Sequence, residues 1–167
     1  MPQSLPDMIV RGRGGKAHGT RPEQSPARTR HRSTVALAGV PLFAGFSKRH
    51  LRRLADATDE VVYRPGEAIV EEDALGETLF VILEGQAKVV RGGKVRTRLV
   101  PGDFFGEVSV LDGGPRTASV VAETPVAALR LFRRTVLEMM ESEPQFALSL
   151  LEGIARRIRE VDRTLTR

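Results

Sequence analysis

The sequence predicts one mainly β domain, an antiparallel β-barrel or jelly roll with helices at both ends. Between residues 61 and 132, many short apolar runs alternate with turn residues at near-regular spacing, which is typical of such folds. An apolar segment with a helix start at Ser47 precedes these runs, and a long amphipathic helix follows them. The composition changes near residue 34, so we place the folded domain at residues 34–167 and a tail before it.

Residues 1–33 are predicted to form a disordered basic tail. They contain seven Lys/Arg against two acidic residues, several glycines and prolines, and few apolar residues, so they bury too little surface to order. The chain has 26 basic and 21 acidic residues; subtracting the tail's seven and two leaves 19 of each for the domain. The tail therefore carries the net charge of +5. A solvated extension, or a start misassigned ahead of Met8, is favoured over an arm that binds nucleic acid or an anionic membrane.

The composition also narrows the chemistry. The absence of cysteine excludes disulfides, thiolate metal sites and thiol catalysis, and no apolar run approaches the length of a membrane span. Without a secretory signal pattern, we expect a cytoplasmic protein. His18, His31 and His50 all precede the β region, so a metal site on the strands is not predicted. No catalytic constellation stands out, and we expect neither an enzyme nor a cofactor.

The first predicted elements lead into the strands. Val40 to Phe46 forms an apolar segment, and Ser47 is suited to cap a helix that carries Leu51, Leu54 and Ala55. The pair Gly92-Gly93 predicts a hairpin turn. The predicted strands are residues 61–63, 68–71, 79–83, 87–90, 94–100, 119–122 and 126–132.

Two helices are predicted at the end of the chain. The first spans Arg133 to Met140, and the second starts near Pro144, since proline suits a first helical turn. The second helix carries an apolar stripe at steps of three and four, which fits packing on the barrel or a two-helix coiled coil. The residues of the stripe are Phe146, Leu150, Ile154, Ile158, Val161 and Leu165.

Residues 105–118 have the composition of a site for a small phosphorylated sugar. Gly106 lets the backbone approach a ligand closely, and Glu107 can accept hydrogen bonds from sugar hydroxyls. A short helix from Val108 to Leu111 would offer free N–H groups to an anion. Arg116 offers a planar fork to phosphate oxygens, with the Thr117 hydroxyl beside it. The alternative is an ion pair between Glu107 and Arg116.

This segment reads F-G-E-V-S-V, a short spacer, then P-R-T-A, and it resembles the phosphate-binding cassette of the cyclic nucleotide-binding domain family. Val110 stands where leucine is usual. The resemblance covers about residues 34–165 and implies a β-barrel with a C-terminal helix as lid. It implies that Glu107 binds the ribose 2′-hydroxyl and that Arg116 binds the cyclic phosphate with nearby backbone N–H groups. The residues that it assigns to the cyclic nucleotide are Gly106, Glu107, Val108, Ser109, Arg116, Thr117 and Ala118.

The resemblance says less about which purine base the site prefers, adenine or guanine. In the bacterial catabolite-activator branch a Thr-Ser pair on the last helix contacts adenine, and Val161 and Asp162 occupy those positions here. Asp162 could instead accept hydrogen bonds from guanine, with help from Thr117. We place cAMP slightly ahead of cGMP. Arg157 either reaches the base or phosphate or, as we favour, is one of several solvated arginines.

The resemblance implies a regulatory sensor in which ligand favours one position of the last helix. Members of the family often also use this helix as a dimer seam. Output is therefore expected through a homodimer formed by that helix, through an effector partner or through a separate polypeptide. The sequence stops at Arg167 without a helix-turn-helix, so a stand-alone domain is expected. Two alternatives stay open: a degenerate domain that serves as an interaction or dimerisation module, and nucleic-acid binding through the basic tail.

Overall fold

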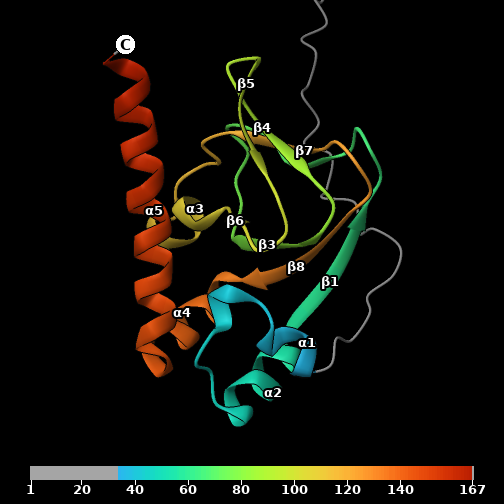
Figure 1. Ribbon diagram of the computed structural model, residues 1–167, viewed down its shortest axis with the longest axis vertical. Helices are drawn as coiled ribbons and strands as arrows, with labels where there is room; N and C mark the ends of the chain where they lie inside the picture. The colour runs from blue at the N-terminus through green and yellow to red at the C-terminus, as the bar shows by residue number, and fades with distance from the viewer. Residues whose placement is uncertain (1–33, 167) are drawn as a thin grey trace, which may run out of the picture.

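The computed structural model describes residues 34–166, which form two antiparallel sheets flanked by helices (Figure 1). The predictions for residues 1–33 lie outside the described residues. The elements are α1 (Thr34–Ala38), η1 (Pro41–Phe43), α2 (Lys48–Ala57), β1 (Thr58–Tyr63), β2 (Ala68–Val70), β3 (Thr78–Glu84), β4 (Ala87–Arg91), β5 (Lys94–Leu99), β6 (Phe104–Phe105), α3 (Glu107–Asp112), β7 (Ser119–Ala122), β8 (Val126–Phe132), α4 (Arg133–Ser142) and α5 (Pro144–Leu165).

The strands confirm the predicted jelly roll, although they do not close into one barrel. One four-stranded sheet has the order β1-β8-β3-β6, and the other has the order β2-β7-β4-β5. Strand β1 begins at Thr58 rather than Val61, because its polar first half pairs with β8 from Thr58↔Leu131 onward. The two-residue strand β6 is absent from the prediction, since Phe104 and Phe105 are too few to show a period.

Two apolar clusters hold these layers together. One fills the space between the two sheets, with Phe80 and Phe105 stacked at 5.1 Å between ring centroids. The other lies between the outer face of the β1-β8-β3-β6 sheet and the helices. Strand β3 has apolar residues from Leu79 to Ile82 without alternation because both of its faces are covered.

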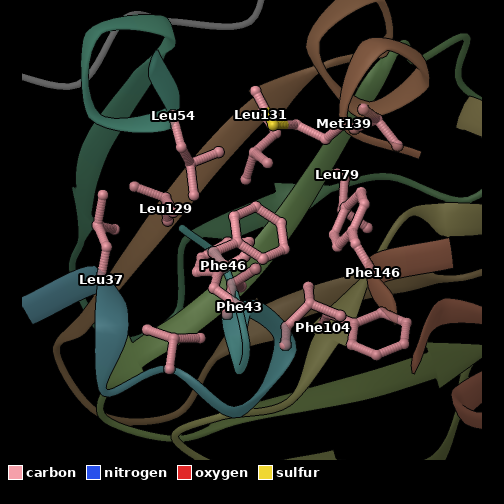
Figure 2. Packing of buried hydrophobic residues seen from close by; sticks show 14 of the residues in the cluster. Leu37, Phe43, Phe46, Leu54, Leu79, Phe104, Leu129, Leu131, Met139 and Phe146 are labelled. Carbon is pink, nitrogen blue, oxygen red and sulfur yellow. The ribbon is translucent and has the colours of Figure 1, made fainter. Parts of the chain in front are cut away.

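The helix-side cluster fixes the start of α5. Figure 2 shows the rings of Phe43, Phe46 and Phe146 meeting inside it, and their centroids lie 5.5 to 6.2 Å apart. Aromatic rings at such separations stabilise the fold by more than the burial of their apolar area alone. The His50 side chain of α2 also pairs with Glu143, immediately before α5. The first turns of α5 are therefore anchored to the segment that precedes the strands.

The predicted stripe of α5 is only partly a packing face. Phe146 and Leu150 are buried, whereas Ile158, Val161 and Leu165 are 56%, 54% and 80% exposed. The second half of α5 extends past α4 and α3 toward the C-terminus (Figure 1). Packing on the sheets thus accounts for the first half of the stripe alone. No helix within residues 34–166 has the length and apolar character needed to cross a bilayer.

Candidate functional site

The candidate site is built around α3, whose two ends are glycines in the left-handed region. Gly106 precedes the helix with φ 85°, and Gly113 follows it with φ 73°. A Cβ at Gly106 would lie 2.6 Å from both the Thr78 carbonyl oxygen and Arg116 Nη1, so only glycine fits. The helix begins at Glu107, one position before the predicted Val108. The chain therefore turns tightly against β3 before the helix starts.

Arg116 is buried, with 5% of its surface exposed, and it points toward the start of β3. Its Nη1 donates to the Thr78 carbonyl oxygen at 2.8 Å and to the Gly106 carbonyl oxygen at 3.3 Å. Its Nη2 donates to Thr78 Oγ1 at 2.8 Å. These neutral acceptors fix the plane of the guanidinium, and its positive charge lies beside the turn that opens α3.

Gly76 forms one wall of the space that the guanidinium occupies. A Cβ at this position would lie 2.2 Å from Arg116 Nε and 2.4 Å from Cζ. The same loop also binds the backbone of the arginine, since the Arg116 amide donates to Ala74 O at 2.8 Å and the Asp73 amide donates to Arg116 O at 2.9 Å. The loop between β2 and β3 is thus shaped around Arg116.

Glu107 is also buried, with 4% of its surface exposed. It lies in the first turn of α3, where a carboxylate is favoured by the helix dipole. Its carboxylate oxygen Oε1 accepts a hydrogen bond from Arg157 Nη1 of α5. The partner of Glu107 thus comes from the last helix, a pairing that the sequence did not predict.

The other predicted site residues divide by burial. Ser109 is 2% exposed and its Oγ donates to the Pro115 carbonyl oxygen at 3.2 Å, so this hydroxyl braces the loop after α3. Val108 and Thr117 are exposed, and Ala118 is half-buried. Ser109 is therefore buried like Glu107 and Arg116, whereas Val108 and Thr117 lie at the surface.

Helix α5 lies across this site through Arg157. Arg157 donates from Nη2 to the Phe104 carbonyl oxygen, and its Cζ lies 5.1 Å from the centroid of the Phe104 ring. The preference for a solvated Arg157 was wrong, because Gly153 lets the helix approach closely: a Cβ there would lie 2.3 Å from Phe104 Cζ. The spacing of Phe146, Leu150, Gly153 and Arg157 on one helical face could have revealed this contact.

Val161 and Asp162 lie farther along α5 and are exposed. Figure 1 shows this end of the helix extending past α3. Among the described residues, no group of three or more His, Asp or Glu side chains is placed to hold a metal ion.

The fold and the site define a jelly-roll ligand-binding domain, with a buried arginine and a buried carboxylate beside one short helix and a long helix across them. Residues 60–143 match the family model described as "Cyclic nucleotide-binding domain". The chain belongs to this family, as the cassette predicted. The family is one of regulatory, non-catalytic domains.

Similar proteins fall into bacterial and eukaryotic groups. The chain is 35% identical over 131 residues to the cyclic AMP receptor protein of Thermus thermophilus. The aligned region covers 75% of this chain and 61% of that protein. It is 39% identical over 100 residues to a cAMP-dependent protein kinase regulatory subunit of Aspergillus fumigatus, covering 58% of this chain and 24% of that protein. The chain thus spans less than two thirds of the length of either relative.

Solved structures show the same fold. The structure described as cAMP-bound PfPKA-R has a TM-score of 0.71 with this chain at 23% identity, covering 78% of this chain and 45% of that one. At this identity the likeness concerns the fold alone. It agrees with the two antiparallel sheets, the flanking helices and the C-terminal helix described above.

Proposed function

We propose that the domain binds a cyclic purine nucleotide at Gly106–Ala118 and acts as a regulatory sensor, without catalysing a reaction. The observation that carries the proposal is the burial of both Arg116 and Glu107 next to the turn at Gly106, whose carbonyl oxygen accepts from Arg116 Nη1. The guanidinium suits the cyclic phosphate, and the carboxylate suits the ribose 2′-hydroxyl. Each group serves one of the two polar parts that all cyclic nucleotides share.

For the base, we place cAMP ahead of cGMP. The names of the relatives, a cyclic AMP receptor protein and cAMP-dependent kinase subunits, support this order. Thr117 is exposed at the end of the cassette, from where its hydroxyl can face a purine. Val161 and Asp162 would need a movement of α5 to contact the base.

Titration of the full chain with cAMP and with cGMP tests the proposal. We expect saturable heat for at least one nucleotide, with cAMP tighter. We also expect thermal unfolding to shift upward, since ligand at a hundredfold its Kd adds about 2.7 kcal/mol to the free energy of unfolding. If neither nucleotide gives heat or a thermal shift, the domain keeps the fold without the ligand and is an interaction module.

The contact between α5 and the cassette suggests how binding is transmitted. Arg157 covers a carboxylate whose side chain is only 5% exposed, so a ribose reaches Glu107 when Arg157 moves aside. Nucleotide binding then exchanges the Arg157–Glu107 pair for a hydrogen bond from the ribose. The population shifts toward another position of α5, and the change passes to an effector protein.

Replacing Arg157 by alanine should therefore tighten nucleotide binding. The ion pair is partly exposed, with 37% of the Arg157 side chain accessible, so its loss is worth about 1 kcal/mol, or about fivefold in Kd. Isothermal titration of the Arg157→Ala and wild-type chains measures this change. Arg156→Ala is the matched control, because Arg156 is exposed on the same turn. Weaker binding in Arg157→Ala would mean that Arg157 holds the ligand or Glu107 in place.

The exposed half of α5 suggests a homodimer. Leu151, Ile158, Val161 and Leu165 are more than half exposed and recur at steps of seven, three and four, as in a coiled-coil seam. We propose that α5 pairs with α5 of a second copy along these residues. Light scattering of the purified chain should give twice the monomer mass of 18.3 kDa, and Ile158→Lys should return it to that mass. A wild-type monomer at high concentration contradicts the proposal.

A further inference from the structure

The β4–β5 hairpin concentrates positive charge in a domain that is otherwise acidic. Residues 87–99 contain Lys88, Arg91, Lys94, Arg96 and Arg98 and no Asp or Glu. Since residues 34–167 hold equal numbers of basic and acidic residues, the rest of the domain has an excess of negative charge. The hairpin projects from the end of the sheets away from α1 and α2 (Figure 1).

The register of the hairpin places like charges directly opposite each other. Lys88 pairs with Arg98, and Arg91 pairs with Lys94, on either side of a register shift near Val89. Like charges in such cross-strand positions destabilise a sheet. Within residues 34–166, the ion pairs include one member of this group, Arg98, whose Nε lies 3.0 Å from Glu123 Oε2. The arrangement lowers the stability of the free hairpin and becomes favourable when an anionic partner lies on it.

Within residues 34–166, strand β5 is also an open edge of its sheet. It is the last strand in the order β2-β7-β4-β5, and every side chain from Lys94 to Arg98 is exposed. An edge strand presents backbone N–H and C=O groups that another extended segment can pair with. A second copy of the same hairpin would bring basic side chains against basic side chains, so the edge disfavours pairing with itself. An extended segment with acidic side chains can pair with the backbone groups of β5 and also neutralise the positive charge of the hairpin.

Other anionic partners fit these residues less well. Residues 87–99 contain no aromatic side chain on which the bases of a single-stranded nucleic acid could stack. A lipid surface binds best where basic residues adjoin large apolar anchors, and the apolar residue most exposed on β5 is Val95, at 47%.

We propose that the β4–β5 hairpin is a docking surface for an acidic peptide segment in extended conformation, which adds a strand to the edge of β5. Backbone hydrogen bonds to β5 would hold the segment, and carboxylates at alternate positions would neutralise the hairpin. The basic residues of this surface lie outside the cassette at residues 105–118.

The test uses the full chain and a fluorescent ten-residue peptide of alternating Glu and Thr. We expect anisotropy to rise saturably as the wild-type chain is added. The affinity for the peptide should fall at least about tenfold in the double variant Lys94→Glu/Arg96→Glu. The control Arg52→Glu/Arg53→Glu makes the same charge change at exposed positions of α2 and should bind like the wild type. Amide hydrogen exchange at residues 94–98 should slow about tenfold with peptide, which attraction between charges alone does not cause.

Two further arms identify the partner. A single-stranded oligonucleotide and vesicles containing phosphatidylserine replace the peptide in the same titrations. Tighter hairpin-dependent binding of either one overturns the proposal in favour of a nucleic-acid or lipid surface. Equal peptide binding by the hairpin variant and the wild type, or unchanged exchange at residues 94–98, overturns it too. Thermal unfolding of each variant shows whether it is folded. The neutral variant Lys94→Gln/Arg96→Gln should show a loss of peptide affinity between those of the wild type and the glutamate variant, because it removes the positive charge without adding negative charge.

Discussion

The Arg116→Glu substitution should abolish nucleotide binding and destabilise the domain. It replaces the cation that we propose binds the cyclic phosphate with a carboxylate, so we expect affinity to fall by at least about a hundredfold, or about 2.7 kcal/mol. It also sets a buried carboxylate against the carbonyl oxygens of Thr78 and Gly106, which accept from the arginine in the wild type. Stranding a buried charge in this way costs about 3–5 kcal/mol of the free energy of unfolding.

Isothermal titration and urea denaturation measure the two effects separately. Arg134→Glu is the matched control, because the Arg134 side chain is 91% exposed and the charge change is the same. If the glutamate variant is too unstable to titrate, Arg116→Lys keeps the charge and removes the planar fork, and its affinity should still fall at least about tenfold. Wild-type affinity in a folded Arg116 variant would place the phosphate elsewhere.

The Gly76→Ala substitution should weaken binding although Gly76 is not one of the predicted ligand-binding residues. Its φ lies outside the positive region, so the backbone accepts alanine, but the new methyl would overlap Arg116 Nε at 2.2 Å. The guanidinium must shift, and a shift breaks its hydrogen bonds to Thr78. We expect a loss of about 1–3 kcal/mol in the free energy of unfolding and at least about a tenfold loss in affinity.

The same two measurements apply, with Gly39→Ala as the control. A Cβ at Gly39 would meet its nearest neighbour, the Ala36 carbonyl oxygen, at an ordinary 3.5 Å. The control should leave nucleotide affinity unchanged. Undisturbed affinity in Gly76→Ala would show that the position of the guanidinium is not what the phosphate requires.

The sequence predicted the fold well where the signals are local. Strands β7 and β8 have the predicted bounds, and Ser47 caps α2 by accepting from the His50 amide at 3.2 Å. The pair Gly92-Gly93 turns the β4–β5 hairpin with φ 58° and 74°. Each of these features depends on backbone conformation or side-chain chemistry within a few residues, which a single sequence displays directly.

The candidate site was harder to predict because its partners are distant in the chain. The cassette motif identified Glu107 and Arg116, but Glu107 meets Arg157, 50 positions later, and Arg116 meets Thr78, 38 positions earlier. Such contacts follow from how α5 and β3 lie beside α3, and the α5 contact depends on a glycine, Gly153. In the sequence, an isolated glycine in a helix suggests lower helix stability rather than a close approach.

The single continuous helix α5 has a mechanical consequence. Its 22 residues make a stiff rod about 33 Å long, which contacts the Phe104 ring at Gly153 and has only exposed residues from Ile158 to Leu165. Gly153 therefore acts as the fulcrum of a lever. A tilt of about 10° there would sweep Leu165, twelve residues away, through about 3 Å. A displacement of Arg157 at Glu107 that is shorter than one hydrogen bond would therefore produce a larger displacement of the C-terminal end of α5.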